Sequence, residues 1–336
     1  MTAHIPRFQA IDGVEVVGVA NRTRESGERA AGELGIPRVY DDWAPLIDDP
    51  DIDAVFIGTW PYMHRTLVAA ALEHDKHVLT QARMAMDASE AREMLAASLR
   101  RPGLVAQVIP GYMADPAVVR TLDELIAEGS TGEILSIDFT ARSGFADPHG
   151  TFTWRHDRDP SGLNTMMLGG RYEDLMRVFG PATSVTAVTR VFHPLLRDEA
   201  GGTRVTSLPD HIEVIAEMAG RALLRMGLST VTGLVPPSEL WVFGAEGTVR
   251  CILEPHATAA SSGIWVGRRG DTKLAEVPLL YPLGDGVPTE RQFIDAIRGE
   301  GPVGETTFED GVRYMEFTEA VLRSAQQGRT IPLPIA

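Results

Sequence analysis

The alternation of apolar runs with helical segments between Val14 and Ile109 constrains the fold most strongly. The segments GVEVVGVA (13–20), DAVFIGT (53–59) and LVAQVIP (104–110) are continuous apolar runs, typical of strands buried on both faces of a parallel sheet. Helical patterns of 10–15 residues separate such runs, which is the signature of repeated strand–helix–strand units. This pattern predicts an α/β domain over residues 1–112, built on a doubly wound parallel sheet.

After Pro110 the pattern changes to longer runs of alternating polar and apolar residues. Examples are EILSIDFTARSG (133–144), HIEVIAEMAG (211–220) and ELWVFGAEGTVRCIL (239–253). Alternation of this kind predicts a mostly antiparallel sheet with one solvated or subunit-facing side. We therefore expect a second, α+β domain over residues 113–336, whose last helix packs back toward the first domain.

The sequence opens on a helix where a dinucleotide-binding unit would open on a strand. The segment HIPRFQA (4–10) is typical of the first helix of such a unit, and no strand with a Gly-rich turn precedes it. That turn normally lets a pyrophosphate approach the helix N-terminus. Because the missing strand lies in mid-sheet, its absence leaves two ladders of backbone groups unpaired. We expect a shortened chain or a mis-assigned start, in preference to a natural chain that folds without this strand.

Charge and cysteine content exclude several functional classes. The formal net charge of −15 opposes nucleic acids and anionic membranes, which require clustered Lys and Arg. No apolar run approaches the roughly 18 residues of a membrane span. Cys251 is the only cysteine, which excludes internal disulfides and predicts a reducing, cytoplasmic location. No spacing of His and carboxylate residues predicts a metal site.

The turn that ends the run HVLTQ (77–81) lies where an α/β enzyme usually has catalytic groups, but it offers no side chain that titrates near neutral pH. Ligands of open α/β sheets bind at the carboxyl ends of the strands, and here that end offers Gln81, Ala82 and Arg83. None of these residues titrates near neutral pH. The next helix is predicted to begin at Ala88, with Asp87 as its N-cap and a Glu three residues later at the capping-box spacing.

Asn21 and Arg22 follow the first buried strand. An acidic residue at this position would bind a ribose 2′-hydroxyl, whereas an Arg suits a 2′-phosphate. The pair therefore indicates either a preference for NADP or an ordinary polar turn. After the next strand, Trp60 could wall a flat ring or fill a crevice, and His64 is either a rim residue or a structural histidine.

The segment LGGRYEDLMRVFG (168–180) predicts a helix with polar side chains at one-, three- and four-residue spacings. Arg171–Asp174 and Asp174–Arg177 are either functional groups or ordinary ion pairs between residues three apart. Tyr172 could donate a proton only if a neighbouring cation lowered its pKa from about 10.

Taken together, these stretches resemble the glucose–fructose oxidoreductase / inositol dehydrogenase / rhizopine-catabolism (Gfo/Idh/MocA) family. The resemblance is carried by HIPRFQAIDGVEVVGVANRT, GIPRVYDDWAPLIDDPDIDAVFIGTWPYMH, ALEHDKHVL, GSTGEILSIDF, FGAEGTVR and TTFEDGVRYMEFTEAVLRSAQQGRTIPLP. It implies an N-terminal Rossmann domain and a C-terminal domain whose open sheet forms a dimer face. It also implies NAD(P)-dependent oxidation or reduction of a secondary alcohol of a sugar or cyclitol.

The sequence departs from this family at its catalytic positions. The usual Glu-Lys-Pro is Gln81-Ala82-Arg83 here, and the usual Asp-x-x-x-His has Met167 and Arg171 in place of its Asp and His. Because all three members of the Lys/Asp/His set change together, we interpret the site as rewired, in an atypical branch of the family.

Three groups of site residues follow from the residues and the resemblance. The candidate cofactor-binding residues are Asn21, Arg22, Thr59, Trp60, Pro61, His64 and Gln81. The candidate substrate-binding residues are Tyr112, Asn164 and His211. The candidate catalytic residues are Arg83, Arg171, Tyr172 and His156. Arg83 could polarise a substrate oxygen but is a poor base, so Tyr172 or His156 would have to shuttle the proton. His156 lies in WRHDRD (154–159), which a surface loop explains equally well.

The leading functional hypothesis is an NAD(P)-dependent oxidoreductase that prefers NADP and acts on a small sugar-like or cyclitol-like alcohol. Binding of NADP (or NAD) would require the missing strand and Gly-rich loop in the native protein. The alternatives are a non-redox member, either a sugar-binding or regulatory pseudo-enzyme, and a keto-sugar lyase or isomerase. We expect no nucleic-acid or membrane partner, and a homodimer or homotetramer formed through the C-terminal sheet.

Overall fold

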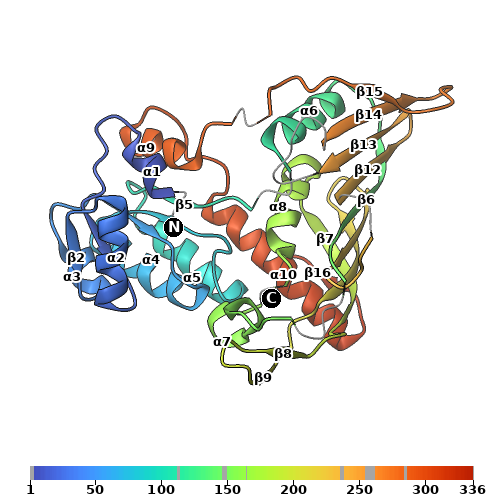
Figure 1. The fold of residues 1–336 in the computed structure, drawn as a ribbon. Coiled ribbons are helices and arrows are strands. Elements are labelled where there is room, and N and C mark those ends of the chain that lie inside the picture. Colours follow the sequence, from blue (N-terminus) through green and yellow to red (C-terminus); the bar gives the residue numbers. More distant parts are fainter. Residues whose placement is uncertain are drawn as a thin grey trace. The chain divides into compact units, whose positions relative to one another are not determined.

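The computed structural model describes residues 4–111, 114–145, 150–163, 165–234, 238–253, 262–283 and 286–335 (Figure 1). The chain divides into two compact units. Unit 1 comprises Met1–Pro110 and Val287–Val312, and unit 2 comprises Gly111–Gly286 and Arg313–Ala336. In the described part of the chain, no helix is both long and apolar enough to cross a membrane.

Unit 1 is built from short parallel strands and helices in alternation. Its elements are α1 (His4–Gln9), β1 (Gly18–Ala20), α2 (Arg24–Leu34), β2 (Arg38–Tyr40), α3 (Trp43–Asp48), β3 (Ala54–Ile57), η1 (Pro61–Met63), α4 (His64–Glu73), β4 (His77–Thr80), α5 (Ala88–Leu99), β5 (Ala106–Val108) and α9 (Thr289–Arg298). The strands pair as β1-β2 and as β3-β4-β5, parallel throughout. The predicted parallel sheet of Rossmann type is therefore confirmed, in two pieces.

The break in this sheet lies between β1 and β3. Within the described ranges, β1 pairs with β2 alone and β3 pairs with β4 alone. Each of these strands keeps one edge whose backbone groups have no ladder partner. The parallel strands that the structure describes in unit 1 are therefore divided between two sheets at these edges.

Local capping explains where the helices of unit 1 begin and end. Thr23 accepts a hydrogen bond from the backbone N–H of Ser26 (3.2 Å) at the start of α2, and Gly35 ends that helix with a left-handed φ of 68°. Asp87 accepts from the backbone N–H of Glu90 (2.9 Å) at the start of α5. The caps predicted at Gly35 and Asp87 are thus confirmed.

Residues 287–312 return to unit 1, although the sequence analysis assigned them to the second domain. Phe293 of α9 packs with Phe8 of α1 and Leu79 of β4 in one apolar cluster. An isolated bridge also pairs Gln107 with Thr307. The physical reason is that the apolar face of α9 completes the core around α1, which no local sequence pattern reveals.

Unit 2 is dominated by one large sheet. Its elements are α6 (Pro116–Ala127), β6 (Ile134–Arg142), η2 (Trp154–His156), α7 (Arg158–Ser161), α8 (Leu168–Phe179), β7 (Ala182–Arg190), β8 (Leu195–Arg197), β9 (Thr203–Val205), β10 (His211–Met218), β11 (Leu223–Ser229), β12 (Ser238–Gly244), β13 (Gly247–Leu253), β14 (Gly263–Arg268), β15 (Ala275–Val277), α10 (Phe308–Gln327, its first five residues in unit 1) and β16 (Ile331–Pro332). The nine-stranded order is β15-β14-β13-β12-β6-β11-β10-β7-β16. Only β6 and β11 pair in parallel, so the predicted open, mostly antiparallel sheet is confirmed.

One face of this sheet is covered by helices and the other is open. Helices α6, α8 and α10 lie against the covered face (Figure 1). The register aligns Val214, Met226 and Phe139 on that face, and all three are buried. The open face carries Asp138, Trp241, Arg250 and Trp265, aligned across four strands.

Candidate functional site

Gln81, at the carboxyl end of β4, is tied to both α1 and α9. Its side-chain amide lies 3.3 Å from His4 Nε2, and His4 Nδ1 is hydrogen-bonded to Glu290. Glu290 is fully buried, and Arg7 lies 3.6 Å from the same carboxylate oxygen. Burial alone would raise the pKa of Glu290, but hydrogen bonds from His4 and from its own backbone N–H outweigh burial and lower it. This network fixes the side chain of Gln81 at the carboxyl end of β4.

His64 connects the two turns that follow β3 and β4. Its Nδ1 lies 3.1 Å from the carbonyl oxygen of Arg83 and 3.0 Å from that of Met84, and its Nε2 lies 3.0 Å from the carbonyl oxygen of Thr59. The ring is fully buried, and burial lowers its pKa. All polar atoms of the ring are thus engaged with backbone, which favours the structural reading of His64.

Arg22 and Trp60 meet at the carboxyl ends of β1 and β3. The Arg22 guanidinium carbon lies 5.7 Å from the centre of the Trp60 ring, and the Trp60 and Tyr62 rings are 6.4 Å apart. Both aromatic rings are exposed. Asn21 donates instead to the backbone carbonyl of Ser26 (2.9 Å), inside the first turn of α2. The geometry therefore leaves a cation and an exposed aromatic platform at this rim.

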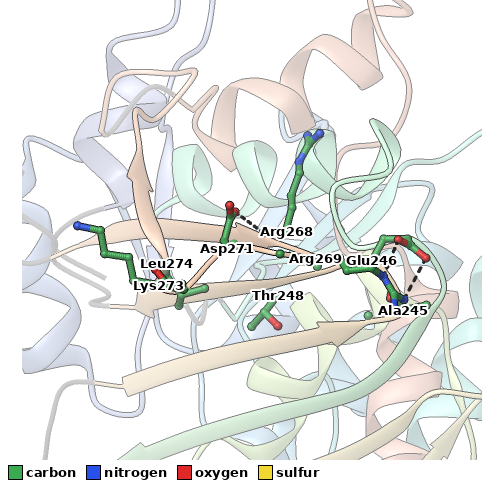
Figure 2. Close-up of a pocket in the computed structure, with 13 residues that line it drawn as sticks. Ala245, Glu246, Thr248, Arg268, Arg269, Asp271, Lys273 and Leu274 are labelled. Atoms are coloured by element: carbon green, nitrogen blue, oxygen red, sulfur yellow. Dashed lines mark hydrogen bonds and ion pairs between the residues drawn. The ribbon is translucent and has the colours of Figure 1, made fainter.

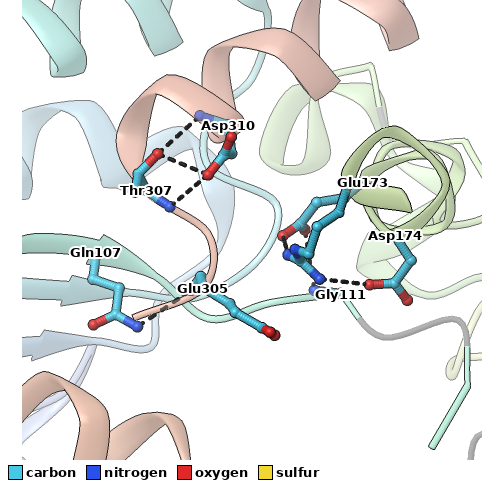
Figure 3. Close-up of polar contacts among 8 residues, drawn as sticks. Gln107, Gly111, Glu173, Asp174, Glu305, Thr307 and Asp310 are labelled. Atoms are coloured by element: carbon cyan, nitrogen blue, oxygen red, sulfur yellow. Dashed lines mark hydrogen bonds and ion pairs between the residues drawn. The ribbon is translucent and has the colours of Figure 1, made fainter. Parts of the chain in front are cut away.

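Arg171 lies in the first turns of α8, with its guanidinium carbon 5.9 Å from the centre of the Phe139 ring. Its Nε and Nη1 are buried and have no hydrogen-bond partner in the described part of the chain, and burial lowers its pKa. The side chains of Glu173 and Asp174 (Figure 3) bind Arg177, at 2.7 and 3.0 Å. The Asp174–Arg177 pair considered from the sequence is therefore formed, whereas no Arg171–Asp174 pair forms.

Tyr172 is adjacent to Arg171 in the chain but points into the core of unit 2. Its ring stacks on Phe317, with ring centres 3.6 Å apart and planes inclined by 2°. Its hydroxyl oxygen accepts a hydrogen bond from the backbone N–H of Ala182 (2.7 Å). Burial raises the pKa of Tyr172 to about 12, despite the opposing charge of Arg313. The condition for a proton donor, a pKa lowered by a cation, is not met.

The remaining candidates in unit 2 do not gather around Arg171. His156 closes the short helix η2, where its Nδ1 accepts from the backbone N–H of Thr153 (3.0 Å), and burial lowers its pKa. His211 lies on the open face of the sheet in phase with Glu213, whose Oε1 is 3.4 Å from Nε2. Arg171 contacts the covered face. Tyr112 and Asn164 lie outside the described residues.

A shallow groove lies at one end of the large sheet. It has a volume of about 470 Å³ and is lined by residues 244–248 of the β12–β13 turn and 267–274 of the β14–β15 hairpin (Figure 2). Arg269 pairs with Glu246 (3.2 Å), and Asp271 accepts from the backbone N–H of Arg268 (2.8 Å). None of the predicted site residues lines this groove.

The contact between His4 and Glu290 could not be predicted from the sequence. They are separated by 286 positions and meet only because α1 and α9 pack together. A partial signal existed, since Glu290 is an acidic residue in the first turn of a strongly amphipathic helix, where a carboxylate is favoured. Nothing local, however, pairs it with a histidine near the N-terminus.

Comparisons with known proteins agree with the division of the chain into two units. Residues 1–108 match an oxidoreductase family with an NAD-binding Rossmann fold, and residues 119–250 match the GFO/IDH/MocA C-terminal domain. D-apiose dehydrogenase of Paraburkholderia graminis is 26% identical over 98% of this chain and 86% of that protein. 1,5-Anhydro-D-fructose reductase of Ensifer adhaerens is 33% identical over 45% of this chain and 44% of that protein.

Among solved structures, levoglucosan dehydrogenase in complex with NADH and levoglucosan has the same fold, with a TM-score of 0.83 at 22% identity. The match covers 99% of this chain and 94% of that one. The two family matches fall on the two units in turn and together span most of the chain. This protein therefore belongs to the Gfo/Idh/MocA family of NAD(P)-dependent oxidoreductases.

Proposed function

We propose that this protein transfers hydride between NADP(H) and a secondary alcohol of a sugar-like or cyclitol-like substrate. Family membership supports the redox chemistry, and relatives named as sugar dehydrogenases and reductases support the substrate class. The observation that carries the choice of NADP is the position of Arg22 at the carboxyl end of β1, beside Trp60.

Arg22 differs from its neighbour Arg24 in its electrostatic surroundings. Arg24 pairs with Glu28 (2.9 Å) and with Asp41, whereas Arg22 has no acidic partner among the described residues. No acidic residue ends β1 to accept a ribose 2′-hydroxyl. A free guanidinium beside an aromatic ring suits a 2′-phosphate next to an adenine. These residues fit the adenosine end of the cofactor, although no described residue supplies a Gly-rich turn for its pyrophosphate.

Cofactor binding to the purified chain, measured by calorimetry, tests this proposal. A charge-assisted hydrogen bond contributes about 1.5–3 kcal/mol, so NADPH should bind about 10- to 100-fold more tightly than NADH. Arg22→Ala should remove that preference. Arg24→Ala is the matched control, because its guanidinium is already paired, and should keep the preference. Equal affinity for the two cofactors would refute the NADP preference, and binding of neither would refute the redox function.

When bound, the nicotinamide supplies the hydride chemistry, and the chain supplies positioning and proton handling. The contact of Gln81 with His4 supports a role for Gln81 in orienting the ring. Arg83 has a permanent charge that can polarise a substrate oxygen but cannot act as a base. General acid–base catalysis commonly contributes about 10²–10⁴-fold. We therefore expect slower turnover than in relatives that keep the Lys/Asp/His set.

A second candidate function follows from the same absence of a base. Either arginine, Arg83 of unit 1 or Arg171 of unit 2, would supply a permanent cation that promotes elimination or isomerisation of a keto-sugar without net redox change. Turnover that leaves the absorbance of NADP(H) constant would favour this lyase or isomerase reaction. A stoichiometric change in that absorbance would favour the oxidoreductase.

The open face of the large sheet supports the expected homodimer or homotetramer. Val188, Ile215 and Leu223 lie on neighbouring strands of that face and are 49–53% exposed. Apolar exposure of this kind is typical of subunit contacts. Ile215→Asp should lower the mass measured by light scattering, whereas Leu99→Asp, at an exposed position on α5, should not.

A further inference from the structure

The guanidinium of Arg171 is a largely buried positive charge without a counter-charge in the described part of the chain. Its Nε and Nη1 are shielded from water and make no hydrogen bond. Phe139, whose ring faces the guanidinium at 5.9 Å, is itself fully buried. Burial lowers the pKa of Arg171, with no acid to offset the effect. An arrangement of this kind destabilises the fold unless something else binds the charge.

The position of Arg171 on α8 adds a second cost. It is the fourth residue of a helix that begins at Leu168, and the positive end of the helix dipole disfavours a cation there. The helix does contain buried acids, but Glu173 and Asp174 both bind Arg177 (Figure 3). Both carboxylates therefore bind another cation, and stability of the fold does not explain why an arginine stands here.

The backbone at the start of α8 is held in a costly arrangement. Met166 and Met167 have φ values of 44° and 57°, in the left-handed region that residues other than glycine rarely adopt. Gly170 lies so close to Gly111 that a Cβ on Gly170 would be 3.0 Å from the Cα of Gly111. The helix start is therefore fixed against its neighbour. Backbone strain beside a buried polar group is a common feature of ligand-binding sites.

We propose that Arg171 is the receptor for an anionic group of the substrate, a carboxylate or a phosphate. The inference rests on the proposed function and narrows its substrate from a neutral sugar to a sugar acid or sugar phosphate. A guanidinium is planar, stays protonated and matches both anions through paired N–H donors. In the apolar surroundings provided by Phe139, attraction to an anion is stronger than in water. Arg171 binds and orients the substrate, and it does not exchange protons with it.

Calorimetry on the full chain, with and without NADPH, tests the proposal with matched pairs of probes. D-Galacturonate is compared with D-galactose, and D-glucose 6-phosphate with D-glucose, so that each pair isolates one anionic group. At least one anionic probe should bind 10-fold or more tightly than its neutral counterpart, and the pair that responds identifies the anion. Arg171→Met should abolish this difference. Arg323→Met, which removes a half-buried arginine that is paired with Glu319 in the same unit, should preserve it.

The unfolding temperature of Arg171→Met without ligand separates a ligand-binding arginine from a structural one. Loss of a structural arginine would lower that temperature. Arg171→Met removes an uncompensated buried cation and should raise the unfolding temperature by about 2–4 °C. If that variant does not fold, the unfolding temperature of the wild-type chain still tests the anion site. Anionic probes should raise it more than their neutral counterparts.

The proposal is overturned if neither anionic probe is preferred over its neutral counterpart, or if Arg171→Met keeps the preference. Selective binding of an anion by a chain that binds no NADPH or NADH would refute the proposed redox function and leave the anion site standing. Intact NADPH binding without anion selectivity would refute the anion site alone.

Discussion

Replacement of Tyr172 by Phe separates a role in stability from a role in proton transfer. The change removes one oxygen from a side chain that is 1% exposed and leaves the stack on Phe317 in place. The backbone N–H of Ala182 then loses its acceptor at 2.7 Å. A buried donor left unsatisfied costs about 1–3 kcal/mol, and each kcal/mol lowers the unfolding temperature of a domain of this size by about 2–4 °C.

Two measurements on Tyr172→Phe check this reasoning. Urea unfolding followed by fluorescence should show the loss of stability, and the rate constant for turnover should stay within about twofold of wild type. Tyr62→Phe, at an exposed position in η1, is the control and should change neither quantity. If Tyr172→Phe kept full stability and lost turnover by 100-fold or more, Tyr172 would be the proton donor and the reasoning from burial would be wrong.

Three further substitutions or treatments test other contacts. Burial lowers the pKa of His64, so its contribution to stability is present at neutral pH and is lost as the pH falls below about 6.5. This loss lowers the free energy of unfolding by up to about 1.4 kcal/mol per pH unit. In His64→Gln, urea unfolding should show a smaller decrease over the same pH range. Asp87→Ala removes the N-cap of α5 and should cost about 1 kcal/mol. Burial raises the pKa of the Cys251 thiol to about 12, so Ellman's reagent should label it only after unfolding; rapid labelling of the folded chain would contradict its burial.

Features that depend on local periodicity could be predicted from the sequence. The run GVEVVGVA predicts a strand, which the structure forms over Gly18–Ala20 only, and the spacing from Asp87 to Glu90 correctly predicts the N-cap of α5. The partner of α9 could not be predicted in this way. Its amphipathic pattern predicts a helix, but the contact with α1 arises from packing between segments 286 positions apart.

The face on which His211 lies was also available in the sequence. In HIEVIAEM, the apolar residues Ile212 and Val214 alternate with His211 and Glu213. Strand geometry places the first two on the helix-covered face and the last two on the open face. The alternation thus separates His211 from any residue on the helix-covered face, and the family register alone did not reveal this.

Arg171 and Tyr172 show why residue type and spacing are insufficient for assigning a role within a helix. Adjacent residues of an α-helix point about 100° apart. Two neighbouring residues that are both candidates for catalysis therefore face different parts of the protein. Both positions of α8 face apolar rings, Phe139 for Arg171 and Phe317 for Tyr172. A phenol satisfies such a position with one hydrogen bond, here to Ala182, and becomes part of the core. A guanidinium needs a counter-charge, which the described chain does not supply to Arg171, so the ligand contact is assigned to Arg171 and not to Tyr172.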